Sequence, residues 1–159
     1  MTYADITQSR FQFMEKRRLR EEELRDIAKK IFDDYEESLE LNNAYWSDRN
    51  GTKRPYVTIQ LKNENGLFQI TPAAVLRLDK DFKLNFFIAT VIDDSFDGNN
   101  YQKLVPISLY KDAGGIQVDI GVDKKILSVR DAYADGAFYD VSKAIQGVII
   151  SDYNDSRLY

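Results

Sequence analysis

The 159-residue sequence contains no cysteine and no histidine. The lack of cysteine excludes disulfide bonds, thiolate nucleophiles and zinc fingers. The lack of histidine removes the commonest general base and the commonest ligand of transition metals. Together these absences exclude most familiar catalytic and metal sites, and the sequence predicts no cofactor.

Long apolar runs are missing as well. No window approaches the roughly 18 consecutive apolar residues that a membrane-spanning helix needs. The opening segment MTYADITQSR lacks the apolar core of a signal peptide. We therefore predict a soluble, cytoplasmic protein that does not bind membranes. Its net charge of −4 disfavours bulk affinity for nucleic acid.

The composition predicts one domain. A chain of this length is about one domain, and a hydrophobic share of 43% is enough for one packed core. We predict a single domain over residues 1–159. Within it, residues 1–22 form a projecting arm or a separate short helix, and residues 151–159 form a loose tail.

The first third of the chain has helical periodicity. Apolar residues recur every three or four positions, which places them on one face of an α-helix. We expect this helix to end near Asn42 and Asn43. The stripe comprises Leu24, Ile27, Ala28, Ile31, Phe32, Tyr35 and Leu39.

The stripe fails upstream of Leu24, because its extension would bury Arg17, Arg20 and Glu21. A single helix over residues 10–42 would be about 50 Å long, which exceeds the width of a domain of this size. The segment before Leu24 should therefore break into a second helix or project from the body. In either case it exposes Phe11, Phe13, Met14 and Leu19.

The middle of the chain predicts a first hairpin around Asn65-Gly66, the strongest short-range hairpin signal. A two-residue turn there would pair Glu64 with Leu67, Asn63 with Phe68 and Leu61 with Ile70. In that register Leu61 and Ile70 share a face with Val57 and Ile59.

Two further hairpins are expected. The second comprises residues 74–92, turns at Asp79–Asp81, and has a second strand that is apolar on both sides, as in a central strand. The third pairs residues 103–110 with 115–122, and Pro106 should lie at a sheet edge or a bulge.

Helical spacing returns over residues 137–150. The predicted fold class is α+β. A long N-terminal amphipathic helix and a C-terminal helix pack on one face of an antiparallel sheet of about five to six strands built from hairpins.

The stretch DDSFDGNN matches the first half of a calcium-binding loop, with Asp93, Ser95, Asp97 and Gly98 at the first, third, fifth and sixth positions. The position that should hold a bidentate Glu is Leu104, and strands rather than helices flank the stretch. An acidic hairpin turn is the favoured interpretation. Asp93, Ser95 and Asp97 are retained only as weak metal candidates.

The segment YDVSK, from Tyr139 to Lys143, resembles the Tyr-x-x-x-Lys signature of short-chain dehydrogenases, in which Ser128 would be the upstream serine. The resemblance covers about a dozen residues. That family needs a glycine-rich turn after an early strand, and this chain has none. We therefore do not predict a dehydrogenase.

Lys16, Arg17, Arg18 and Arg20 form a basic cluster interleaved with aromatic residues, as in some nucleic-acid-binding arms. The glutamates at 21–23 follow directly, within a Debye length of about 8–10 Å. A solvated helix is the better interpretation, and nucleic acid is not the predicted partner.

The predicted function is a non-enzymatic protein-binding module: an acidic inhibitor, an immunity or antitoxin-like protein, or an accessory protein that docks on a basic partner surface. Tyrosines alternate with carboxylates near the C-terminus, and tyrosine is enriched in interfaces. A homodimer through the N-terminal helix is a further expectation. The alternative is a small-ligand or calcium-binding domain, or a carboxylate-dependent enzyme, on the sheet. The candidate partner-binding residues are Tyr133, Asp135, Phe138, Tyr139, Asp140, Tyr153 and Asp155, with Phe11 and Phe13 on the arm.

Overall fold

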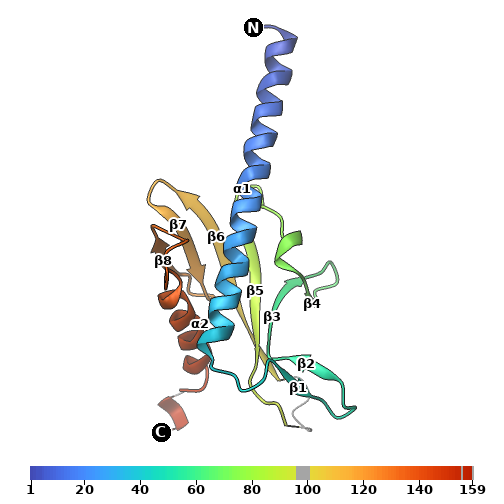
Figure 1. Cartoon of the computed structure of the whole chain (residues 1–159), viewed down its shortest axis with the longest axis vertical. Coiled ribbons are helices and arrows are strands. Elements are labelled where there is room, and N and C mark those ends of the chain that lie inside the picture. Colours follow the sequence, from blue (N-terminus) through green and yellow to red (C-terminus); the bar gives the residue numbers. More distant parts are fainter. Residues whose placement is uncertain (96–100, 155, 159) are drawn as a thin grey trace.

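A computed structural model describes residues 1–95, 101–154 and 156–158. Two α-helices lie on one face of an antiparallel six-stranded sheet, with strand order β4-β3-β5-β6-β7-β8 (Figure 1). The predicted α+β class is confirmed. The helical elements are α1 (Tyr3–Ser38), η1 (Ala73–Val75), α2 (Tyr139–Ser151) and η2 (Ser156–Leu158), and the strands of the sheet are β3 (Val57–Lys62), β4 (Phe68–Ile70), β5 (Leu84–Val91), β6 (Gln102–Asp112), β7 (Gly115–Ile120) and β8 (Lys125–Val129).

Helix α1 is one continuous helix of 36 residues, about 54 Å long at 1.5 Å per residue. A capping box starts it: the Thr2 hydroxyl accepts from the Asp5 backbone N–H, while the Asp5 carboxylate accepts from the Thr2 backbone N–H. Its N-terminal part projects beyond the sheet (Figure 1). The segment before Leu24 is therefore part of the same helix as the residues that follow it.

The C-terminal end of α1 differs from the prediction. The helix ends at Ser38, before Asn42 and Asn43, and Glu40 has a positive φ of 52°. A residue in the left-handed region just after the last turn is the usual way to stop a helix. Glutamate in that role is uncommon, so the sequence contains no signal that would have predicted this end of the helix.

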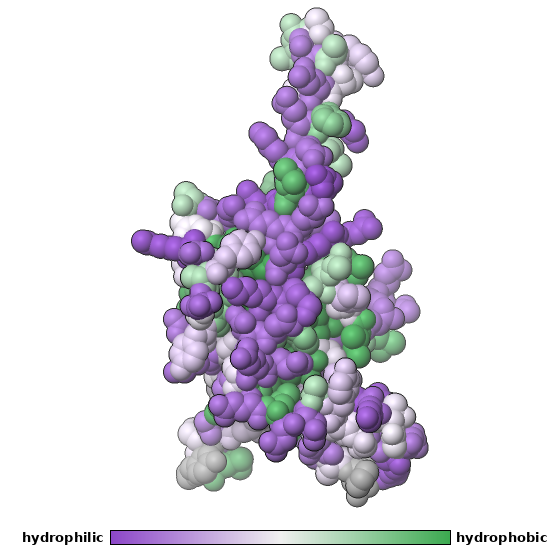
Figure 2. Space-filling model, viewed as in Figure 1, coloured by the Kyte–Doolittle hydropathy of each residue, from purple (hydrophilic) through white to green (hydrophobic). Residues whose placement is uncertain are grey.

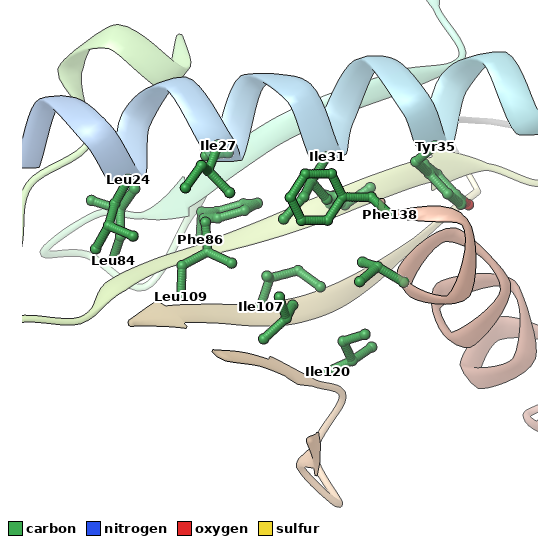
Figure 3. Close-up of a cluster of buried hydrophobic side chains, with 14 of the residues drawn as sticks. Leu24, Ile27, Ile31, Tyr35, Leu84, Phe86, Ile107, Leu109, Ile120 and Phe138 are labelled. Carbon is green, nitrogen blue, oxygen red and sulfur yellow. The ribbon is translucent and has the colours of Figure 1, made fainter. Parts of the chain in front are cut away.

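The core lies between the two helices and the sheet. Leu24, Ile27, Ile31 and Tyr35 point from α1 toward β5 and β6, as Figure 3 shows. Each fully buried side chain of this size contributes roughly 1.5–3 kcal/mol of transfer free energy. The predicted stripe therefore attaches the part of α1 from Leu24 onward to the sheet.

The charged residues that interrupt the stripe have a structural reason. Of these residues, Arg17 and Glu21 contact the backbone of residues 76–78, just after η1, and Arg25 further along the helix does the same. Arg25 donates to the Leu76 carbonyl at 2.6 Å, and Arg17 donates to the Leu78 carbonyl at 3.1 Å. Glu21 accepts from the Leu78 backbone N–H at 3.0 Å. Because residues 76–78 have only a single bridge to the sheet, these side chains satisfy backbone groups that a strand would have paired.

The register of the first hairpin was predicted wrongly by one residue. Leu61 pairs with Gln69, and Gln60 pairs with Ile70. The loop contains one residue more than predicted. The Asn63 backbone N–H donates to the Leu67 carbonyl, so residues 64–66 form the loop, and Gly66 within it has a positive φ of 79°. The shift moves Ile70 to the face opposite the core, where it is 68% exposed.

The second hairpin is only half formed. Residues 73–75 are the 3₁₀ helix η1 rather than a strand, and only Leu78 bridges to Leu84. The predicted turn at Asp79–Asp81 is confirmed, since the Asp79 carboxylate accepts from the backbone N–H groups of Asp81 and Lys83. Strand β5 is central, but helices cover only one of its faces.

Pro106 does not lie at an edge or a bulge, because β6 pairs with β5 on one side and β7 on the other. Its carbonyl accepts from the Gly121 N–H, one residue beyond the end of β7. The Pro106 nitrogen, which has no hydrogen to donate, therefore faces a position beyond the last β6–β7 pair, so no strand hydrogen bond is lost.

Three strands were not predicted. They are β8 at one edge of the sheet, and the separate two-stranded hairpin of β1 (Tyr45–Ser47) and β2 (Lys53–Pro55). The C-terminal helix is confirmed as α2, whose buried side includes Val141, Ala144 and Ile145. None of the described helices combines the length and the hydropathy that a bilayer-spanning helix requires.

Candidate partner-binding groove

The C-terminal end of α1 is rich in carboxylates. Asp33, Asp34, Glu36 and Glu37 occupy its last turns, and its last turn contains no basic residue. The helix macrodipole places partial negative charge at this end, where cations are stabilising and carboxylates are not. Carboxylates at this end therefore weaken the helix rather than stabilise it.

Of these carboxylates, Asp34 and Glu37 line a groove between α1 and α2 with a volume of about 600 Å³. The two helices are joined there by a hydrogen bond, in which Gln146 of α2 donates to the Ser38 hydroxyl at 3.0 Å. Ser38 in turn donates to the Tyr35 carbonyl at 2.6 Å. We call this feature the acidic groove; it is lined by Asp34, Glu37, Ser38, Glu40, Gly136, Tyr139, Ser142, Lys143 and Gln146.

The electrostatics of the groove favour a cation. Partial burial raises the pKa of Asp34, and the neighbouring carboxylates Glu37 and Asp33 raise it further, while Lys30 opposes them. Three carboxylates face one ammonium group, that of Lys143, which lies 4.8 Å from the centre of the Tyr139 ring. A guanidinium or ammonium group entering the groove would relieve the repulsion among the carboxylates. Tyr139 also offers an aromatic face for a cation.

The predicted partner-binding residues divide into separate places. Tyr139 lines the acidic groove and is exposed, and Tyr133 and Asp135 are exposed on the turn before α2. Asp140 lies on the other flank of α2, where it lines a second cavity of about 630 Å³ with the β7–β8 turn. Only Tyr139 therefore joins the acidic groove directly.

The remaining candidates lie elsewhere. Phe138 is 0% exposed and belongs to the core, so it is a packing residue and offers no surface to a partner. Tyr153 follows the far end of α2, where Lys103 lies 5.2 Å from its ring centre. Phe11 and Phe13 are on the projecting arm, at the opposite end of the molecule from the C-terminus (Figure 1). Asp155 lies outside the described residues.

The weak metal candidates are described only in part. The Asp93 carboxylate accepts from the Ser95 backbone N–H at 3.0 Å, and bonds to Ser95 lower the pKa of Asp93. Asp97 lies outside the described residues. Within residues 1–95, 101–154 and 156–158, no group of three carboxylates is placed to hold a metal ion.

The dehydrogenase-like segment forms no corresponding site. The ammonium group of Lys143 lies over the Tyr139 ring, and Ser128 on β8 donates to Gln117 at 2.5 Å. The sheet is antiparallel, whereas a dinucleotide-binding domain needs a parallel one.

The basic cluster of the arm is largely paired. Arg18 forms ion pairs with Glu15 and Glu22, and Arg20 lies 3.9 Å from Glu23. Arg17 is half-buried and bonds the Leu78 carbonyl. This pairing leaves less positive charge for phosphate groups and agrees with the solvated-helix interpretation.

Comparison of the chain with protein-family models, with curated proteins and with solved structures returned no significant match. The acidic groove therefore has to be interpreted from its own residues. Sequence reasoning missed Asp34, Glu37 and Glu40, although one signal was present: carboxylates gather at a helix C-terminus without a basic residue in the last turn.

Proposed function

We propose that this protein is a non-enzymatic binding module that docks on a basic surface of another protein, as an inhibitor, an immunity or antitoxin-like protein, or an accessory protein does. Its acidic groove receives a lysine or arginine side chain of that partner. The observation that carries the proposal is the gathering of Asp34, Glu37 and Glu40 beside Tyr139 in one groove at the negative end of α1.

The groove suits a protein partner better than a free ion. Its walls combine carboxylates with an exposed aromatic ring and the amide of Gln146, the mixture that a long cationic side chain with an apolar stem would contact. Tyr133 and Asp135 on the neighbouring turn are exposed and extend the surface. Complementary charge at such an interface raises the association rate and sets specificity more than it raises affinity.

Site-specific photocrosslinking tests the proposal. A benzophenone amino acid replaces Tyr139, the tagged protein is expressed in its native cells, and the covalent product is identified by mass spectrometry. We expect one protein with a basic surface to be captured at Tyr139. Capture should fall when Asp34→Asn, Glu37→Gln and Glu40→Gln are combined, because these changes remove the negative charge but keep the size of each side chain.

A matched control removes the same charge elsewhere. Glu64, Asp81 and Asp123 are exposed and lie outside the groove, so Glu64→Gln, Asp81→Asn and Asp123→Asn together should leave capture unchanged. Equal loss of capture in both triple variants would show that the net charge of the protein, and not the acidic groove, governs capture. Undiminished capture in the groove variant would contradict the proposal.

A further inference from the structure

A third, smaller cavity lies on the face of the sheet that the helices leave open. Strand β3 alternates: Val57 and Ile59 enter the core, so Thr58 and Gln60 face the other side. The hairpin β1–β2 and the hairpin β3–β4 enclose there a cavity of about 250 Å³, whose wall includes Trp46, Thr58 and Gln60. We call it the Trp46 pocket. It is independent of the acidic groove.

The Trp46 pocket contains an unsatisfied donor. Trp46 is only 7% exposed, and its indole Nε1–H is buried without an acceptor among the described residues. A buried donor that has lost its water and gained no partner costs stability. Such groups are uncommon in folded proteins, and here the indole belongs to a cavity wall. An acceptor brought by a ligand would remove this cost once the side chains around the indole adjust.

The residues that line the pocket carry no negative charge. The chain has a net charge of −4, yet no residue that lines this pocket is acidic, and one of them is Arg54. The Arg54 Nε donates to Asp48 at 2.6 Å, which orients the guanidinium at the rim. Gln60, which is 4% exposed, donates to Thr58 and to Gln102. Because Arg54 is ion-paired with Asp48, the polar wall is close to neutral, and it is held in place by its own hydrogen bonds.

The other walls are apolar. Phe68 and Ile70 of β4 line the pocket with Val91 of β5. Phe68 packs edge-to-face on Phe87, with ring centres 4.9 Å apart. Figure 2 shows apolar surface beside α1 where η1 and the β3–β4 hairpin lie. The one-residue register shift of the hairpin is what brings Phe68 and Ile70 to this face.

We propose that the Trp46 pocket binds a small monocarboxylic acid with an aromatic or branched aliphatic body. The apolar body contacts Phe68 and Ile70, and the carboxylate lies toward Arg54 and the Trp46 indole N–H. The volume equals that of about eight water molecules, which limits the ligand to the size of a single side chain. Arg54 and the Trp46 indole offer only hydrogen-bond donors, which favour a carboxylate over an ammonium group.

Trp46 is the only tryptophan of the chain, so its fluorescence reports on this pocket alone. Phenylacetate is titrated into the intact protein at fixed ionic strength, and phenylacetamide serves as the neutral probe of the same shape. We expect a saturable change of Trp46 emission with phenylacetate, and at least about tenfold weaker binding of the amide. A strictly linear response to both probes up to millimolar concentrations would overturn the proposal.

Gln102→Glu is the most informative variant. The new carboxylate still accepts from Gln60, so the hydrogen bond of the wall is retained, but it places a negative charge in the pocket. We expect phenylacetate to bind about tenfold more weakly and phenylacetamide to bind as before. Lys125→Gln changes the net charge by the same amount outside the pocket and should alter neither. Equal affinities of the wild-type protein and Gln102→Glu for phenylacetate would overturn the proposal.

Trp46→Phe tests the indole N–H, because it keeps an aromatic ring and removes the donor. Binding is then followed by calorimetry, with circular dichroism to show that the variant is folded. We expect weaker binding of phenylacetate, and unchanged affinity would remove Trp46 from the site. The Asp34, Glu37 and Glu40 triple variant should bind phenylacetate like the wild type, so failure of this proposal and failure of the acidic groove are distinguishable.

Discussion

Tyr35 of α1 and Thr90 of β5 share a buried hydrogen bond of 2.7 Å between their hydroxyl groups. The two residues are 55 positions apart in the chain, and Tyr35 is 0% exposed. This bond links the C-terminal part of α1 to β5, a central strand of the sheet. Asp34, the residue before Tyr35, lines the acidic groove. Burial raises the pKa of Tyr35, although the bond to Thr90 works in the opposite direction.

Removal of this bond should destabilise the fold. Tyr35→Phe keeps the packed ring and leaves the Thr90 hydroxyl buried without its partner, which costs about 1–3 kcal/mol. Urea denaturation would show a lower midpoint with an unchanged slope. Tyr133→Phe, at a position that is 67% exposed, is the control and should leave the midpoint unchanged. Equal midpoints for Tyr35→Phe and the wild type would show that the bond contributes nothing.

Phe82 contacts α1 where the projecting part of the helix meets the body. Phe13 packs edge-to-face on Phe82 with ring centres 6.0 Å apart, and Arg17 lies 5.5 Å from the ring centre. Phe82 has a positive φ of 60°, which is strained for a bulky residue. A double-mutant cycle of Phe13→Ala and Phe82→Ala should give a coupling of about 0.5–1.5 kcal/mol. A cycle with Phe11, which is 71% exposed, should give none. Additive effects of Phe13→Ala and Phe82→Ala would contradict the contact.

Deletion of residues 1–12 should leave the domain as stable as before. All twelve residues are exposed, and the hydrogen bonds of their described side chains are local to the helix. A new start at Phe13 retains the contact with Phe82. We expect the change in the free energy of unfolding to stay within about 0.5 kcal/mol. A larger loss would mean that the arm stabilises the body.

The same pair of proteins tests the homodimer predicted through the N-terminal helix. If the arm mediates self-association, light scattering should give a higher mass for the intact chain than for the shortened one, beyond the missing residues. An unchanged association state would contradict the homodimer.

Asp34→Asn should stabilise the protein at neutral pH. The pKa of Asp34 is raised above its ordinary value of 3.8, so folding favours the protonated form, and the charged form weakens the fold at higher pH. Thermal melts should therefore show a higher Tm for the variant at pH 7. The difference should vanish as the pH falls through the pKa of Asp34 toward 3.8. A constant difference at all pH values would show that charge is not the cause.

Gly147 and Gly115 should respond to alanine in opposite ways. A Cβ at Gly147, in the middle of α2, would meet no atom within 4 Å, so Gly147→Ala should stabilise the helix by about 0.5–1 kcal/mol. A Cβ at Gly115 would lie 2.6 Å from the Val129 carbonyl oxygen, and φ is 113° there. Gly115→Ala should therefore destabilise the protein clearly in the same denaturation assay. Destabilisation by Gly147→Ala would mean that the space beside α2 is not open.

The periodicity of the chain alone determined the two helices, the antiparallel sheet and most of the core. Leu24, Ile27 and Ile31 repeat at helical spacing, and that spacing is fixed by backbone geometry whatever the helix packs against. The charges of Arg17 and Glu21 correctly indicated that the apolar stripe does not extend upstream of Leu24. The sequence could not predict the contacts of these two residues, because they are with the backbone of residues 76–78, far along the chain.

Tertiary structure decided the sites. Tyr139 is about a hundred positions from Asp34 and Glu37 in the chain, and these residues share a groove only because α1 and α2 pack side by side. The single extra residue in the Asn65-Gly66 loop moved Phe68 and Ile70 to the open face and completed the Trp46 pocket. Local spacing fixes which face of a helix or strand is apolar. Which faces meet depends on long-range packing and on loop length, and no single segment of the sequence contains that information.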